Sequence, residues 1–194
     1  MGTPVVGVLL AAGRGRRFDP LGQRNKLLQA LPEAGGEPVV ALSARKLLSV
    51  VDTVIAVVPP DDGGVGALLS ALGCEVSVCA DADSGMAASL VHAIRHSLPH
   101  DPAAWLVALG DMPRVAPATL RLLADALAAG APIAAPVMDG RRGNPVGFGR
   151  VHLDALLALK GEQGARRLLH TFPVSELAVQ DPGIFKDIDT PADL

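Results

Sequence analysis

The stretch Val5-Val6-Gly7-Val8-Leu9-Leu10-Ala11-Ala12-Gly13-Arg14-Gly15-Arg16-Arg17 begins as an aliphatic run and ends as an arginine-rich loop with two glycines. A short β-branched and aliphatic run that stops at small residues is typical of a buried strand that opens into a loop. Gly13 and Gly15 permit a tight turn and a close backbone approach, so that amide groups can face an anion. The sequence therefore predicts a strand over Val5–Leu10 followed by a phosphate-binding loop.

This strand-then-loop pattern recurs along the chain and alternates with segments of helical periodicity. Such alternation predicts an α/β fold with a single doubly wound, mostly parallel sheet, whose ligands bind beyond the carboxyl ends of the strands. The further expected strands are 54–58, 75–79, 105–109 and 133–137, and the expected helices are 39–50, 65–72, 86–98, 117–129 and 151–159. Arg141–Pro145 interrupts the alternation, and 174–179 is predicted to be a late edge strand. The sheet is also expected to carry a small antiparallel extension.

The length, charge and composition of the chain limit the classes of protein to which it can belong. A chain of 194 residues suits one domain, which we expect to span residues 1–194. A net charge of −3 and an aromatic fraction of 3% argue against a general nucleic-acid binder. The longest apolar runs are much shorter than the ~20 residues of a membrane span, and the N-terminus lacks a signal-peptide pattern. We expect a cytoplasmic protein that binds neither membrane nor nucleic acid.

The two cysteines and five histidines are not predicted to form a site. Cys74 and Cys79 lie five positions apart in an expected strand, which points them to opposite faces and makes a disulfide between them improbable. The histidines lack metal-ligand spacing, and we interpret them as residues on helix surfaces.

The loop after the first strand is strongly basic. From Arg14 to Lys26 the chain carries five cations and one acid, Asp19, which gives a local charge of +4. A dinucleotide-binding loop would need a third glycine where Phe18 stands, and the chain contains no G-x-x-x-x-G-K-[ST] sequence. Arginines and a lysine around a glycine loop suit a highly charged triphosphate. The alternative is a basic loop that only faces solvent.

Two acidic segments are candidate metal ligands. Asp111 follows an apolar strand, so its carboxylate should project from the carboxyl edge of the sheet, where it could hold Mg²⁺ against phosphate oxygens. Alternatively, it caps the helix expected near Pro117 or closes a turn. Asp187 and Asp189 share one face if the segment is extended, and one of them could be a second ligand. Helix capping by Asp189 or Thr190 is compatible with that role.

The segment Asp81–Leu90 joins the third expected strand to a helix. Ser89 and the backbone donors at this helix N-terminus could hold a base or ribose. Helix capping alone accounts equally well for Ser84.

An ordered series of short motifs resembles the MobA/MocA-like nucleotidyltransferases, most closely the cytidylyl members that act on molybdenum cofactor. The series is specific although each motif alone is weak, and it runs from about Val5 to Leu194. The motifs are Leu10-Ala11-Ala12-Gly13-x-Gly15-x-Arg17-Phe18, Asn25-Lys26-Leu27-Leu28, Gly85-Met86-x-x-Ser89-Leu90, Gly110-Asp111-Met112-Pro113, Gly143-Asn144-Pro145-Val146, Gly164-Ala165-Arg166 and Asp187-Ile188-Asp189-Thr190-Pro191.

The resemblance implies a Rossmann-like nucleotidyltransferase fold and a role for each matching residue. Arg17 and Lys26 would grip phosphates, and Asp111 with Asp189 would hold Mg²⁺. Ser89 would lie near the base or ribose. The segment with Asn144 and Pro145 would face the acceptor. Base and triphosphate would be bound by Leu10, Ala11, Ala12, Gly13, Arg14 and Gly15.

The resemblance also bears on the substrate. Leu-Ala-Ala-Gly resembles cytidylyl members, whereas guanylyl members tend to have Leu-Ala-Gly-Gly, so CTP is expected before GTP. Two features depart from the family pattern: the connection between Phe18 and Lys26 is longer, and Asn144 stands where many cytidylyl members carry histidine.

The expected reaction is in-line attack by an acceptor phosphate on the α-phosphorus of CTP, with release of pyrophosphate. Molybdopterin or molybdenum cofactor is the expected acceptor, and a molybdoenzyme is a possible partner. Two alternatives remain open at this point: a transferase for another small phosphorylated acceptor, and a non-catalytic nucleotide or pterin chaperone of a molybdoenzyme. Phe18 disfavours an NAD(P) oxidoreductase.

Overall fold

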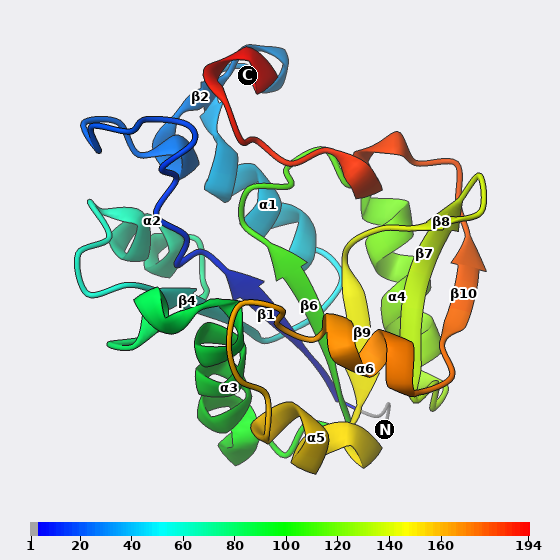
Figure 1. The fold of residues 1–194 in the computed structure, drawn as a ribbon. Coiled ribbons are helices and arrows are strands. Elements are labelled where there is room, and N and C mark those ends of the chain that lie inside the picture. The colour runs from blue at the N-terminus through cyan, green and yellow to red at the C-terminus, as the bar shows by residue number, and fades with distance from the viewer. Residues whose placement is uncertain (1–3) are drawn as a thin grey trace.

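The computed structural model describes residues 4–194, and its centre is a twisted sheet of eight strands (Figure 1). These strands are β1 (Val5–Leu10), β4 (Val54–Val58), β5 (Glu75–Val78), β6 (Ala104–Leu109), β7 (Ile133–Met138), β8 (Arg141–Arg142), β9 (Val146–Gly149) and β10 (Ser175–Ala178). Their order is β10-β7-β9-β6-β1-β4-β5, with β8 paired to β7. Separately, β2 (Ala30–Leu31) and β3 (Glu37–Pro38) form a small antiparallel sheet.

The sheet is mixed but mostly parallel. β1 pairs in parallel with β4 and β6, β4 with β5, and β7 with β10. β9 lies antiparallel between β6 and β7, and β8 is antiparallel to β7. The expected α/β class is confirmed, and β10 is the expected late strand at the sheet edge.

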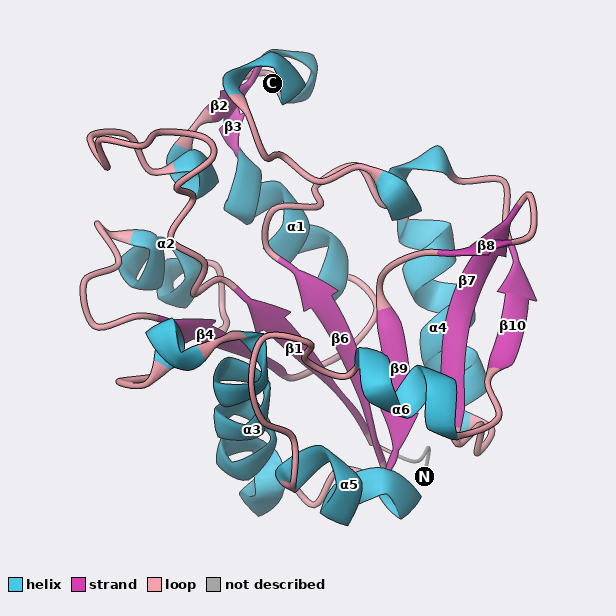
Figure 2. Cartoon of the chain, in the orientation of Figure 1, coloured by secondary structure: helices cyan, strands magenta, loops and turns pink. Residues whose placement is uncertain are grey.

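Helices cover both faces of the sheet (Figure 2). One core layer contains residues of α1 (Val39–Leu48), α2 (Val65–Ala71) and α4 (Pro117–Ala128). The other contains residues of α3 (Met86–Ser97), α5 (Leu153–Leu157) and α6 (Arg166–Thr171). Short 3₁₀ turns connect these elements: η1 (Lys26–Leu28), η2 (Pro32–Ala34), η3 (Ala82–Ser84), η4 (Leu98–His100), η5 (Arg150–His152), η6 (Pro182–Phe185) and η7 (Pro191–Asp193).

The apolar strands are buried on both faces, as a doubly wound sheet requires. In β1, Val6 and Val8 pack into the α3 layer, whereas Leu9 packs into the α1 layer. Cys74 and Cys79 are both free and buried, and they lie in different layers, as their spacing predicted.

The strand order reverses between β1 and β6. From β1 the chain proceeds outward through β4 and β5, and then returns to the other side of β1 to form β6. The loops after β1 and β6 therefore diverge, which opens a crevice at the carboxyl edge of the sheet. Gly110 lets the two strand ends meet closely: its N–H donates to Leu10 O at 2.9 Å, and an added Cβ would lie 3.1 Å from that oxygen.

The C-terminal third departs from the predicted pattern. The antiparallel strand β9 was not predicted, because its sequence Val-Gly-Phe-Gly alternates with glycine, which is depleted in strands. Gly147 is needed there for packing, since an added Cβ would lie 2.3 Å from Leu127 Cδ1 of α4. The helix expected over 151–159 is instead the 3₁₀ turn η5 followed by the shorter α5.

The interpretation of all histidines as surface residues was wrong for His152. This residue is buried, and its ring centroid lies 4.6 Å from that of Phe172. Burial disfavours the charged imidazolium and lowers the pKa of His152 below its usual 6.5. Within residues 4–194, no helix has the length and apolar character needed to cross a membrane.

Candidate functional site

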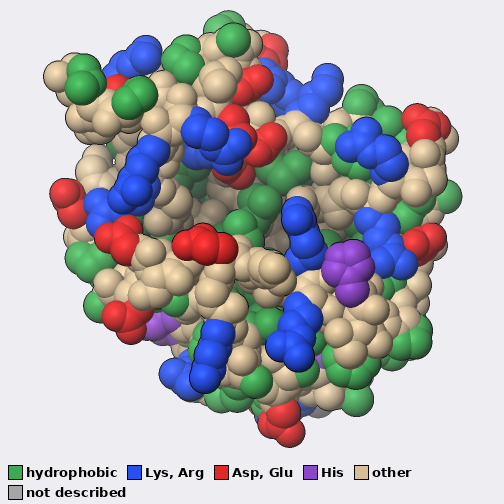
Figure 3. Space-filling view, viewed as in Figure 1, with side chains coloured by type: hydrophobic (Ala, Val, Ile, Leu, Met, Phe, Trp, Pro, Cys, Tyr) green, Lys and Arg blue, Asp and Glu red, His purple; other side chains and the backbone are tan. Residues whose placement is uncertain are grey.

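A cavity of about 550 Å³ opens at the carboxyl ends of β1 and β6, at the point where the strand order reverses. It is visible as the hollow near the middle of the face in Figure 3. The first loop, the start of α3, the residue after β6 and the C-terminal segment all contribute to its wall. The predicted site residues that line it are Leu10, Ala11, Ala12, Gly13, Arg14, Gly15, Arg17, Lys26, Ser89, Asp111 and Asp189.

A second hollow, of about 640 Å³, lies against the other side of the same loop. It is walled by residues 19–29 and by the segment after β4, and it shares residues 13–16 and Lys26 with the first cavity. Although it is larger, it is not lined by Asp111, Asp189 or Ser89. The cavity beside the carboxylates is therefore the one that can support phosphate chemistry.

Lys26 is held in position by the turn that it begins. Asn25 caps η1, with its Oδ1 accepting from Leu27 N at 3.0 Å, while its Nδ2 donates to Asp62 O at 3.2 Å. The Lys26 stem lies against Gly15, where an added Cβ would be 3.4 Å from Lys26 Cγ. Gly15 also has a φ of +60°, which favours glycine. The lysine side chain is 10% exposed, so packing restricts its conformation and holds its amine at the cavity wall.

The ammonium of Lys26 bridges two carboxylates. Its Nζ lies 2.7 Å from Asp111 Oδ2 and 3.4 Å from Asp189 Oδ1. Arg17 approaches the other oxygen of Asp189, with Nη1 at 2.7 Å from Oδ2. The cations expected to grip phosphates and the carboxylates expected to hold metal are thus paired with one another, and this balances the charge of the site.

Asp111 does not cap the helix that follows it. The start of α4 is instead held by Asp181, whose Oδ2 accepts from Ala116 N at 2.8 Å and from Thr119 Oγ1 at 2.7 Å. The backbone of Asp111 serves a different purpose: its carbonyl accepts from Ile188 N at 2.8 Å, which ties the C-terminal segment to the end of β6. The Asp111 side chain is left to face Lys26.

The C-terminal segment presents Asp187 and Asp189 on either side of Ile188, which is fully buried in the core. Thr190 caps η7 in a capping box with Asp193. Because Thr190 has that role, the carboxylate of Asp189 is not used for capping and points toward Lys26 and Arg17.

Oxygen atoms of Asp111, Asp187 and Asp189 lie within 4.8 Å of one another. Partial burial raises the pKa of Asp187, and the nearby charges of Asp189 and Asp111 raise it further. Three carboxylates with oxygen atoms this close together fit a hard divalent cation such as Mg²⁺ or Mn²⁺, which binds oxygen ligands. Either Asp187 or Asp189 could join Asp111 as a ligand.

Arg14 and Ser89 mark the other end of the cavity. The guanidinium of Arg14 forms two hydrogen bonds with Asp83, at 2.6 and 2.5 Å, and so joins the first loop to η3. This pairing lowers the pKa of Asp83. Ser89, in α3, is only 4% exposed, and its hydroxyl makes no hydrogen bond with residues 4–194. A hydroxyl that reaches the wall of the cavity without a protein partner can serve a ligand.

Sequence reasoning singled out the segment Asp81–Leu90 at this end of the cavity but gave its Asp83 and Met86 side chains no role, and it did not find Glu162. All three residues line the cavity. Gly85 has a φ of +117° and lies against Gly161, whose carbonyl accepts from Ala87 N at 3.2 Å. The 161–164 loop is thereby held over the start of α3. The Gly164-Ala165-Arg166 motif was the available signal, but spacing alone could not place its loop in space.

Asn144 and Pro145 do not line the cavity. They lie in the turn between β8 and β9, where Asn144 N donates to Ile184 O at 2.9 Å. The sequence predicts that ligands bind beyond the carboxyl ends of the strands, but the turn that follows β7 and β8 does not join the loops after β1 and β6 in lining the cavity. It packs instead against the segment around Ile184, because the antiparallel strand β9 separates β7 from β6.

Comparison with known proteins identifies the family of the chain. Residues 7–178 match the MobA-like NTP transferase domain. The chain is 33% identical over 200 aligned residues to purine catabolism protein PucB of Bacillus subtilis strain 168. The alignment covers 96% of this chain and 92% of PucB.

Solved structures extend the likeness to the whole fold. The crystal structure of Rv0371c from Mycobacterium tuberculosis H37Rv has a TM-score of 0.84 at 32% identity, covering 100% of this chain and 96% of that one. A complex of Rv0371c with manganese has a TM-score of 0.80 at 30% identity, covering 98% and 96%. The chain belongs to the MobA-like NTP transferase family, and its sheet has the Rossmann-like nucleotidyltransferase fold.

Proposed function

We propose that this protein transfers CMP from CTP to the phosphate of a small acceptor, most simply the pterin phosphate of molybdenum cofactor, and releases pyrophosphate in the cytoplasm. GTP is the second choice of donor. The observation that carries this proposal is the meeting of Lys26, Asp111 and Asp189 beside the Gly13–Arg17 loop.

The first loop would bind the triphosphate. Its glycines allow backbone amides to face phosphate oxygens, and Arg14, Arg17 and Lys26 add positive charge. In the ligand-free arrangement these cations pair with Asp83, Asp111 and Asp189. A triphosphate would take over the cations, and the released carboxylates would be free for a metal ion.

Asp111 with Asp189 or Asp187 would hold Mg²⁺, which when bound would neutralise phosphate charge and favour attack at the α-phosphorus. The manganese complex of Rv0371c supports a divalent ion in this fold. Lys26 and Arg17 would stabilise the charge that develops on the leaving pyrophosphate.

The acceptor step needs little further chemistry from the protein. An oxygen of the acceptor phosphate bonds to the α-phosphorus, and the bond from that phosphorus to the bridging β-oxygen breaks, so that pyrophosphate leaves. A phosphate anion can attack without losing a proton, and therefore no general base is required. Positioning and electrostatic stabilisation account for catalysis of this kind.

Ser89 and the backbone of Leu10–Ala12 would face the cytosine and ribose. Support for CTP comes from the Leu-Ala-Ala-Gly sequence, which resembles that of cytidylyl members. Asn144 and Pro145, placed outside the cavity wall, would act on the acceptor only through a larger substrate that reaches the β8–β9 turn.

The test is pyrophosphate release from CTP and GTP in the presence of Mg²⁺ and a panel of acceptors: molybdenum cofactor, sugar phosphates and an acceptor-free control. We expect release that needs both CTP and molybdenum cofactor. A sugar phosphate as the only productive acceptor would replace the acceptor assignment. Tight cofactor binding without pyrophosphate release would favour the chaperone alternative.

A further inference from the structure

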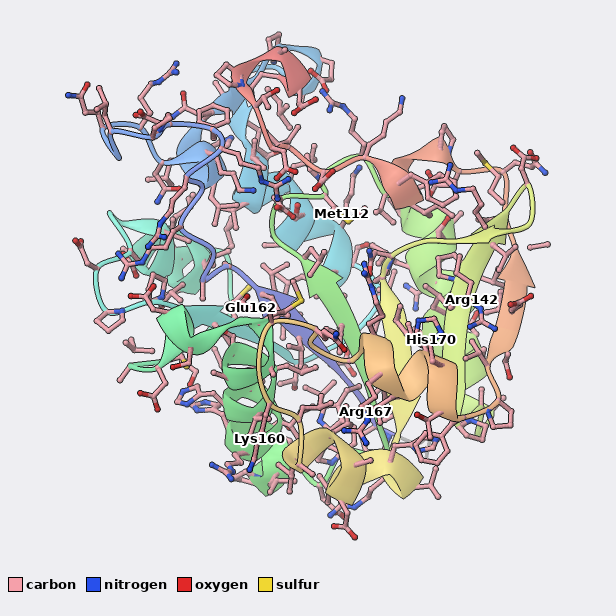
Figure 4. All side chains as sticks on the ribbon, viewed as in Figure 1. Met112, Arg142, Lys160, Glu162, Arg167 and His170 are labelled. Carbon is pink, nitrogen blue, oxygen red and sulfur yellow. The ribbon has the colours of Figure 1, made fainter. Side chains whose placement is uncertain are left out.

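A basic cluster lies on the side of the hollow opposite the nucleotide-binding loop. Figure 4 places Arg142, Arg167 and His170 on one side of the hollow and Glu162 on the other. Figure 3 shows basic side chains gathered with a histidine on that side. Together with Arg166, the neighbour of Arg167 on α6, we call these residues the basic rim.

The charges of the rim are not balanced by the protein. Arg166, Arg167 and His170 are exposed, and within residues 4–194 no carboxylate lies within 4.0 Å of their cationic atoms. Arg166 and His170 are four residues apart on one helix, so their side chains share a face. In the nucleotide cavity, in contrast, Arg14, Arg17 and Lys26 are paired with carboxylates.

Arg142 has a different role in the rim. Its Nε lies 2.6 Å from Glu176 Oε1, and Nη1 donates to Leu169 O at 3.2 Å. It thus links β8 and β10 to the last turn of α6. Leu168, which is 5% exposed, anchors the same helix in the core. The rim is held in place by these contacts rather than carried on a free loop.

The fold brings the rim to the edge of the sheet where Asp111 lies. Because β9 runs antiparallel between β6 and β7, the chain turns at the carboxyl end of β7 and forms β8 there. Gly143 N donates to Pro136 O at 2.9 Å in this turn. The carboxylates after β6 and the cations of β8 therefore lie at the same edge of the sheet, and Arg142 ties α6 to this edge, outside the wall of the 550 Å³ cavity.

From this placement we propose that Arg166, Arg167 and His170 bind an oxyanion of the acceptor and so act as positioning and specificity residues for the second substrate. The inference rests on the proposed function and extends it to the acceptor's own binding site. Arg166 and Arg167 lie four and three residues before His170 on α6, so each shares a side of the helix with it. A guanidinium presents several donors in a planar fork that fits phosphate, and a cluster of such cations favours a dianion over a single carboxylate. The acceptor class is thus a small molecule that carries phosphate.

The test uses inorganic phosphate as a probe of the rim. The ¹⁵N-labelled protein, saturated with Mg²⁺ and a non-hydrolysable CTP analogue, is titrated with phosphate and then with acetate. We expect shifts at the amides of residues 166–170 with phosphate and at least about tenfold weaker shifts with acetate. The double variant Arg166→Ala/Arg167→Ala should weaken phosphate binding at least about tenfold, the loss expected for a charge-assisted contact.

The matched control is Arg95→Ala, since Arg95 is an exposed arginine on α3 away from the hollow. It should bind phosphate as the wild type does, and both variants should bind the CTP analogue normally. Unchanged phosphate binding in the double variant, or equal shifts with acetate, would overturn the proposal. If the wild type fails to bind the CTP analogue, the proposed function is contradicted instead. Phosphate titration of the protein without nucleotide then still tests the rim.

Once the acceptor is identified, steady-state kinetics give a second readout. The double variant should raise KM for the acceptor about tenfold or more and leave KM for CTP unchanged. An equal rise in both KM values would indicate general damage to the fold and would contradict a positioning role.

Discussion

The two sides of the hollow differ in whether their cations are paired with carboxylates. On the nucleotide side, Lys26 and Arg17 are paired with Asp111 and Asp189 at distances down to 2.7 Å. On the rim, Arg166 and Arg167 face water without a carboxylate partner among the described residues. On the nucleotide side, the cations and carboxylates can separate when a triphosphate and a metal ion bind together. The unpaired cations of the rim can bind a single anion directly. The difference indicates two binding events of different character.

The largest expected effect comes from Asp111→Asn. It removes a charge from the carboxylate cluster, so nucleotidyl transfer should fall at least about a hundredfold while the melting temperature changes little. Pyrophosphate release and calorimetric unfolding measure the two quantities. Asp52→Asn, at an exposed position after α1, is the control. Transfer within about threefold of the wild type in Asp111→Asn would remove this cluster from the mechanism.

Lys26→Met should weaken CTP binding about 10–100-fold, because a charge-assisted contact is lost while the apolar stem is kept. The same change removes the cation that bridges Asp111 and Asp189. Mn²⁺ binding without nucleotide, followed by electron paramagnetic resonance, should therefore tighten. A fall in both the CTP affinity and the Mn²⁺ affinity would contradict the idea that the triphosphate takes Lys26 from the carboxylates and leaves them free to bind the metal ion.

Salt should separate the two sides. Because the rim is exposed and unpaired, raising NaCl from about 50 to about 300 mM should increase KM for the acceptor several-fold by screening. Lys26 is largely buried, so KM for CTP at a fixed free Mg²⁺ concentration should change less. Equal salt sensitivity of the two KM values would contradict the contrast between paired and unpaired charge.

The smallest expected effect concerns the support of the rim. His152 is buried against Phe172, which follows α6, and its pKa is lowered. The imidazole stays neutral in the fold, whereas the unfolded chain takes up a proton near pH 6.5, so stability should decline as pH falls below about 6.5. Hydrogen exchange at pH 5.5 should rise in residues 166–171 more than in α3. The reverse order would show that His152 does not support α6.

Much of the fold was predictable because the pattern is local. The strands 5–10 and 54–58 were predicted with the bounds of β1 and β4, since unbroken aliphatic runs end at glycine or proline. β9 was not, because Gly147 serves the packing of Leu127, which is distant in sequence. A strand that is stabilised by a long-range contact need not show a typical strand pattern in its own sequence.

The site was predictable to a similar degree. Lys26, Asp111 and Asp189 were singled out from their motifs, and the structure brings them together in one cavity. Their mutual pairing could not be foreseen, because it depends on the hydrogen bond between Ile188 and Asp111. Glu162 and the rim residues of α6 were not assigned to a site, because the Gly164-Ala165-Arg166 motif marks their segment but does not show where that segment lies in space.

The most direct test of a metal-dependent cytidylyl site is thermal stabilisation by each of the four nucleoside triphosphates, with Mg²⁺ and with a chelator. A ligand at about 100 times its Kd adds about 2.7 kcal/mol of stability, which for a chain of this size corresponds to about 5–10 °C in Tm. We predict that CTP with Mg²⁺ gives the largest rise and that the chelator abolishes most of it. No rise with any triphosphate, or a CTP effect that survives the chelator, would contradict the account.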